Sequence, residues 1–232
     1  MNLSYPTKPP RGEKNQRKYL NHVNKNNLLH MTIYVLGAMI IAFSVVMLIR
    51  SDLGTTPWDV LHVAIATVTP LTVGMATIFV AASITAFIIW ARKSWRYLLM
   101  AIPIVLVGIF IDFFNLIVFD DFTPDGMTQM GSFLAGAALM PLGGVLLVIS
   151  KYPAGVFEEL MLVIMKLLKT RKLIKVRILL ELSPVVIGVL LTGLFKGTIG
   201  SLYLGTAFLV LTTGPFIKLY LTIIRRSIHE DQ

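Results

Sequence analysis

The sequence contains no cysteine, which excludes disulfide bonds, thiolate metal sites and cysteine nucleophiles. Charged residues are scarce, at 14% of the chain against about a quarter in soluble domains. There are 4 histidines, no two of them with the spacing of metal ligands. No glycine-rich phosphate loop or nucleophile motif is present either. The sequence therefore predicts a protein that is not an enzyme and that has neither a metal site nor a cofactor.

Apolar sequence takes the place of these features, since 56% of the residues are hydrophobic and they gather into long blocks. A block of about twenty residues matches a hydrocarbon core about 30 Å thick. The blocks predict an all-α polytopic membrane protein with six transmembrane helices, and the lipid bilayer is its first expected partner. They fall at residues 31–49, 72–90, 98–119, 131–150, 174–194 and 200–224.

The basic residues predict how the chain is oriented. With the N-terminus in the cytoplasm, 19 of the 21 lysines and arginines fall in cytoplasmic tails, loops or helix ends, and only Arg50 and Lys196 fall outside. The positive-inside rule thus predicts a multi-pass protein of the cytoplasmic membrane with both termini cytoplasmic. Because topology explains the formal net charge of +9, nucleic-acid binding is not predicted.

Two polar segments, residues 50–61 and 150–161, interrupt the apolar sequence. When they are overlaid, Trp58-Asp59 aligns with Phe157-Glu158, an aromatic residue followed by an acid. A short amphipathic helix is expected in each segment, at about 55–68 and 155–169, too short to span a bilayer.

Each half of the chain carries three spans, so the second half must insert with the opposite orientation to the first. The sequence thus predicts two inverted three-helix repeats with short interrupting helices, a plan typical of secondary transporters. The alternative is a chance alignment of two apolar halves. The expected units are a flexible basic cytoplasmic tail (1–28), the first repeat (29–122), the second repeat (123–226) and a cytoplasmic tail (227–232).

The segment from Arg50 to His62, RSDLGTTPWDVLH, resembles the signature of the YczE-like (YczE/YyaS/YitT) family of bacterial integral membrane proteins. Glu158-Glu159-Leu160-Met161 and Gly214-Pro215 resemble parts of that family's second half. The resemblance covers about residues 31–220 and implies the architecture of the family more than any activity. The chain departs from the family at Pro153-Ala154-Gly155-Val156, where a Gly-x-Gly-Pro turn is usual.

The first interruption has a structural and a functional interpretation. Thr56, Pro57 and Asp59 form an N-terminal capping sequence for a helix. Alternatively, the break leaves backbone amides and Asp59 facing a cavity, as half-helix ends do in transporters. Trp58 is then a cavity wall rather than an interfacial anchor. His62, three positions after Asp59 and on a similar face, is expected to be a polar filler, and the alternative is a role in a metal site or a proton relay.

Other polar residues near or within the spans are also candidates. Glu158 suits the first turn of the second short helix, and with Asp59 it would form a pseudo-symmetric acidic pair for a cation or proton. Arg177 and Glu181 are spaced i, i+4 and form either a buried bridge between helices or a binding site. Asp112 is an acid inside the third span.

Arg50 ends the first span. It either marks the outer interface or neutralises Asp52 or Asp59.

Two hypotheses follow for the whole chain. The first is a secondary transporter or permease for a small solute or ion. Its candidate substrate-binding residues are Asp59, Glu158, Arg177, Glu181, Asp112, Arg50 and Trp58. The second is a non-transporting accessory or regulatory protein that acts through a membrane partner, with its central acids fully paired. A homo-oligomer is compatible with both.

Overall fold

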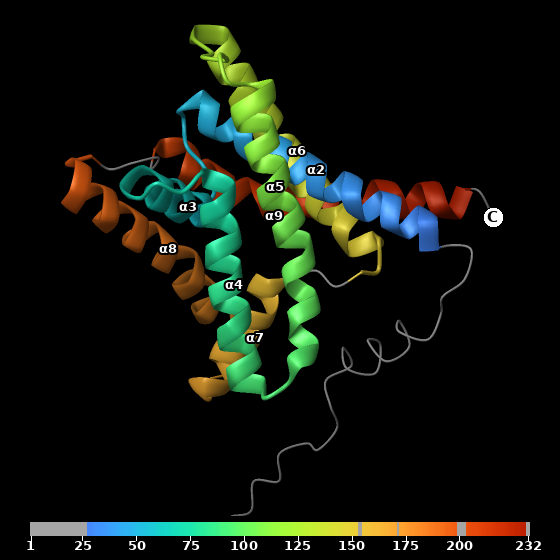
Figure 1. Cartoon of the computed structure of the whole chain (residues 1–232). Helices are drawn as coiled ribbons and strands as arrows, with labels where there is room; N and C mark the ends of the chain where they lie inside the picture. Colours follow the sequence, from blue (N-terminus) through green and yellow to red (C-terminus); the bar gives the residue numbers. More distant parts are fainter. Residues whose placement is uncertain (1–26, 153–154, 171, 199–202, 231–232) are drawn as a thin grey trace, which may run out of the picture.

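A computed structural model describes residues 27–152, 155–170, 172–198 and 203–230, without the side chains of residues 27, 158, 173 and 224–230. The regular elements in these ranges are all helical (Figure 1). They are α2 (Asn27–Ser51), α3 (Pro57–Val68), α4 (Val73–Arg92), η1 (Trp95–Met100), α5 (Ala101–Phe113), η2 (Phe114–Val118), α6 (Gly126–Ile149), α7 (Val156–Leu167), α8 (Leu173–Lys196) and α9 (Leu204–Glu230).

Six stretches of helix are long and apolar enough to cross a membrane, which confirms the six spans predicted from the apolar blocks. The third stretch, Trp95–Val118, is built from η1, α5 and η2 together. Helix α6 begins five residues before its apolar block, because the carboxylate of Asp125 and the hydroxyl of Thr128 form a capping box there. Hydropathy does not detect such polar caps, so it places this helix start too late.

The two short helices also form where the sequence predicts them, within two residues at each end. In α3, Thr56 is the N-cap and Pro57 occupies the first helical position, where its missing N–H costs nothing. Helix α7 follows Gly155, whose φ of +91° is a conformation that glycine adopts without a steric penalty. Each short helix has 12 residues.

Helices α2 and α6 cross in close contact through small residues on both sides (Figure 1). A Cβ atom on Gly37 would lie 3.0 Å from the carbonyl oxygen of Gly143. On the other side, a Cβ atom on Gly136 would lie 2.9 Å from the carbonyl oxygen of Ser44 and 2.7 Å from the side chain of Leu48. Small residues allow backbones to approach this closely inside a membrane.

Helices α4 and α5 run side by side, and α3 packs against both α4 and α8 (Figure 1). At the α4–α5 contact, Gly74 and Gly108 face each other so closely that a Cβ on Gly74 would collide with the Gly108 carbonyl. At the α3–α8 contact, a Cβ on Gly188 would lie 3.0 Å from the carbonyl oxygen of Val60. Both contacts depend on glycine.

The loop between α2 and α3 is fastened to the start of α9. The N–H of Gly205 donates to the carbonyl oxygen of Leu53 at 3.0 Å. Gly54 has a φ of +137°, and a Cβ there would lie 2.5 Å from the backbone nitrogen of Thr206. This junction fixes the position at which α3 begins.

Candidate functional site

The first turn of α3 holds a buried chain of three polar side chains. The hydroxyl of Thr56 donates to Oδ2 of Asp59 at 2.5 Å, and the N–H of Asp59 donates back to that hydroxyl at 3.4 Å. Nδ1 of His62 lies 3.3 Å from Oδ1 of Asp59. Asp59 and His62 are only 5% and 3% exposed. Thr56 is therefore the N-cap, as predicted, and the carboxylate of Asp59 accepts from its hydroxyl and lies against the histidine.

The second ring nitrogen of His62 has no hydrogen-bond partner among the described side chains. Among the described side chains, Nε2 of His62 is buried without a hydrogen-bond partner, and the hydroxyls of Thr55, Thr85 and Thr206 share this property. Thr55 adjoins Gly54, which contacts Thr206, so two of these hydroxyls belong to one neighbourhood. A buried polar atom without a partner costs about 1–3 kcal/mol. Buried hydrogen-bonding groups near the start of α3 are thus able to bind a further polar group.

The first turns of α3 and α7 meet through aromatic rings. The ring centroids of Trp58 and Phe157 lie 4.3 Å apart with an interplanar angle of 33°. Trp58 also packs against the apolar cluster that contains Ile88, Val156 and Leu160. The tryptophan therefore packs at the meeting point of the first turns of α3 and α7.

Asp112 caps a neighbouring helix. Its Oδ1 accepts the N–H of Gly74 at 2.8 Å, and its Oδ2 accepts the hydroxyl of Thr72 at 2.5 Å. Thr72 is the N-cap of α4, so the carboxylate of α5 lies against the positive end of the α4 dipole. This gives Asp112 a structural role that ties α5 to α4.

Arg50 is held by a π turn. In η2, the N–H of Phe119 bonds to the carbonyl of Phe114, five residues back, which leaves the carbonyl of Asn115 free. That carbonyl accepts from Nη2 of Arg50 at 2.6 Å, and the Asn115 side chain accepts from Nε at 3.0 Å. The carbonyl of Asp120 accepts from Nη1 at 3.1 Å. Arg50 therefore binds backbone and amide oxygens here, and the ion pairs between described residues do not join it to Asp52 or Asp59.

Arg177 and Glu181 pair with each other, as their i, i+4 spacing predicts. Nε of Arg177 lies 2.9 Å from Oε1 of Glu181. The side chains are 59% and 31% exposed, and both belong to α8. The alternative of a buried bridge between helices is therefore wrong. The side chain of Glu158, the remaining predicted site residue, lies outside the described part of the chain.

Sequence reasoning missed the ion pair that joins the two halves. Nη2 of Arg92, at the end of α4, lies 2.6 Å from Oε1 of Glu159 in the first turn of α7. The side chains are 22% and 13% exposed. The contact is close but not aligned as a hydrogen bond. The only sequence signal was that two adjacent acids, Glu158 and Glu159, begin one helix.

Comparisons with known proteins support the membrane assignment. Residues 28–222 match the model of a family described as a family of unknown function (DUF6198). The chain is 34% identical to the uncharacterized membrane protein YczE of Bacillus subtilis (strain 168) over 141 residues, which are 59% of this chain and 63% of YczE. It is 26% identical over 194 residues to the uncharacterized protein YyaS of the same organism, covering 83% of this chain and 92% of YyaS. No solved structure matches.

The family match covers all six candidate spans almost completely, together with the Thr56–Asp59–His62 chain. The resemblance predicted from residues 50–62 is thereby confirmed. This chain belongs to the DUF6198 family of YczE-like membrane proteins.

Proposed function

We propose that this protein is a small secondary transporter of the bacterial cytoplasmic membrane, for a small solute or ion. The observation that carries the proposal is the buried Asp59–His62 pair at the start of α3, beside the point where α3 meets α7. Ionisable groups inside a membrane protein are costly and mark pathways for ions, protons or substrates. A histidine with one free ring nitrogen is suited to exchange a proton or to contact a solute.

The contacts between α2 and α6 support a construction from two inverted repeats. Gly37 contacts Gly143 and Leu147, and Gly136 contacts Ser44 and Leu48. The two sets of residues are related by a shift of 99 positions, which takes Gly37 to Gly136, Ser44 to Gly143 and Leu48 to Leu147. The same spacing relates Trp58 to Phe157, which stack on each other. Equivalent residues touch in this way when they lie near a two-fold axis. With three spans in each half, that axis lies in the membrane plane.

The two interruptions have the same local geometry, which further supports the repeat. Ser51 donates its hydroxyl to the carbonyl three residues back at 2.7 Å, and Ser150 does so at 2.6 Å. The next residues, Asp52 and Lys151, adopt left-handed φ values of 52° and 62°. In transporters built from inverted repeats, matching interruptions of a helix in the two halves are the sites at which ligands bind.

We propose that both termini are cytoplasmic, and the even number of candidate spans and the bias of lysine and arginine support this orientation. The accessory-protein alternative has an observation in its favour. Asp112, Arg50 and the Arg177–Glu181 pair all have polar partners within the described part of the chain. We favour transport because the unsatisfied Nε2 of His62 does not fit a fully paired scaffold.

Proteoliposomes test the proposal. The purified full chain is reconstituted and charge movement is recorded on solid-supported membranes for monovalent ions and small organic cations, anions and zwitterions, with a lumenal pH dye for protons. We expect a saturable response to one class and a loss of about tenfold or more in Asp59→Asn, as for the removal of a proton-transfer group.

Asp121→Asn is the matched control, because Asp121 is an exposed acid in a loop and its substitution removes the same charge. Folded wild-type protein that moves none of these probes would overturn the proposal. Equal responses of the Asp59→Asn variant and the wild type would remove Asp59 from the site.

A further inference from the structure

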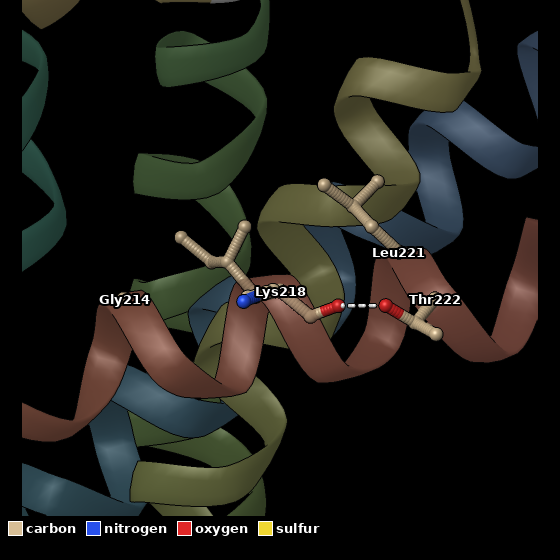
Figure 2. A pocket seen from close by; sticks show the side chains of 5 residues that line it. Gly214, Lys218, Leu221 and Thr222 are labelled. Carbon is tan, nitrogen blue, oxygen red and sulfur yellow. Dashed lines mark hydrogen bonds between the residues drawn. The ribbon is translucent and has the colours of Figure 1, made fainter.

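Helix α9 carries a groove on one of its faces. A cavity of about 320 Å³ is lined by residues at helical spacings of three and four, namely Gly214, Ile217, Lys218, Leu221 and Thr222. Figure 2 shows that the labelled lining residues all come from this one helix. The hydroxyl of Thr222 donates to the carbonyl of Lys218 at 2.8 Å.

Two contacts that hold α9 against α6 involve residues outside the groove. The hydroxyl of Tyr220 donates to the carbonyl of Ala138 at 3.0 Å, and Phe208 packs on Phe133. Only 11% of the spanning window of α9 is buried. A Cβ on Gly214 would find no atom within 4 Å, so the part of the groove next to Gly214 is open space.

Lys218 brings a positive charge into this apolar groove. Its side chain is exposed, and the ion pairs between described residues do not include it. The candidate span extends at least to Ile223, the last residue of α9 whose side chain is described, which is about 7.5 Å of helical rise beyond Lys218. A lysine stem can extend over that distance to the level of the lipid headgroups. An anion at that level would neutralise the ammonium where the bilayer begins.

We propose that this groove binds an anionic phospholipid. The phosphate pairs with the ammonium of Lys218, and one acyl chain lies along Ile217 and Leu221 in the space that Gly214 leaves. Charge complementarity selects the lipid over a protein helix, because an apolar partner would bury the ammonium without a counter-ion. Basic positions next to the cytoplasmic leaflet attract its acidic lipids. The inference does not depend on transport.

Native mass spectrometry of the full chain tests the proposal. The detergent-solubilised protein is titrated with phosphatidylglycerol or phosphatidylcholine of the same acyl composition. We expect wild-type protein to retain phosphatidylglycerol preferentially and Lys218→Gln to bind it about fivefold more weakly, the effect of one basic residue at a membrane surface. Lys218→Arg keeps the charge and is expected to retain the lipid.

Lys196→Gln is the matched control, since Lys196 is an exposed lysine at the end of α8 and its loss is expected to change nothing. Three results would overturn the proposal: equal retention of both lipids by wild type, unchanged phosphatidylglycerol binding by Lys218→Gln, or a dimer that excludes lipid from this face. Lys218 and Lys196 are both exposed, so their substitution is expected to leave the melting temperature unchanged. Melting temperatures of all variants verify that each is folded.

Discussion

The two short helices pack against the opposite half of the chain in different ways. Helix α3 lies against α8 through backbone contact, with Gly188 directly over the carbonyl of Val60. Helix α7 lies against α4 through the apolar cluster around Ile88 and through the Arg92–Glu159 ion pair. A glycine contact opens only if backbones separate, whereas an ion pair exchanges readily with water. The difference identifies the α4–α7 contact as the easier one to open.

The strongest test of this comparison enlarges Gly188. Gly188→Leu would push α3 away from α8, because the new side chain meets the backbone of Val60 at about 3 Å. Overpacking of this kind costs about 1–3 kcal/mol or more, and we expect a clear loss of thermal stability in detergent. Gly144→Leu is the control, since a Cβ there meets no atom within 4 Å. Equal melting temperatures for the two variants would contradict the tight α3–α8 contact.

Removal of the Asp59 carboxylate should have the next largest effect. Asp59→Ala leaves Nδ1 of His62 buried without its partner and removes the acceptor of the half-buried Thr56 hydroxyl. We expect a loss of about 2 kcal/mol in the free energy of unfolding, the cost of unsatisfied buried polar groups. Thermal unfolding measures it, and the variant Asp59→Ala/His62→Leu should recover part of the loss. If the double variant is as unstable as the sum of both single ones, the two side chains are not coupled.

The α4–α7 contact can be opened by the removal of one charge. Glu159→Gln should cost about 1 kcal/mol, because the pair is only partly buried. The absence of cysteine allows a direct readout, since a single Val163→Cys in the wild-type background gives the only thiol. Val163 is 2% exposed in α7, and we expect its labelling by a maleimide to accelerate in the Glu159→Gln variant.

The charge swap Arg92→Glu/Glu159→Arg should restore slow labelling. Glu181→Gln is the matched control because it removes an acid from an ion pair within one helix, and labelling should stay slow. If Glu159→Gln leaves the labelling rate unchanged, the ion pair does not hold α7 against α4.

The smallest expected effect concerns the junction before α3. Burial and the neighbouring Asp52 carboxylate, to which its hydroxyl donates, raise the pKa of Tyr203 above its ordinary value of 10.0. A raised pKa in the folded state means that the contribution of this tyrosine is present below pH 10 and is lost as the pH rises through the shifted value. Tyr203→Phe should slightly lower the melting temperature at pH 8, and the difference should vanish at higher pH.

The sequence could predict elements better than partners. Pro57 and Thr56 specify the start of α3 locally, because a cap needs only residues within one turn. The partners of Arg50 lie 65 and 70 residues away in the sequence, and those of Asp112 lie 38 and 40 residues away. No local pattern records which helices bring them together. The π turn that frees the carbonyl of Asn115 is likewise invisible to hydropathy.

The sequence by itself determined six membrane-spanning helices, two short helices between them and the membership of a family. Apolar block length and capping chemistry act over one helix at a time, and these are readable from the order of residues. Only the tertiary structure decided that Glu159 pairs with Arg92, that the ring of Trp58 lies against Phe157 and that Nε2 of His62 has no partner among the described side chains. Such contacts depend on the distance and rotation between packed helices, which are set by small residues such as Gly37 and Gly188 acting across the whole fold.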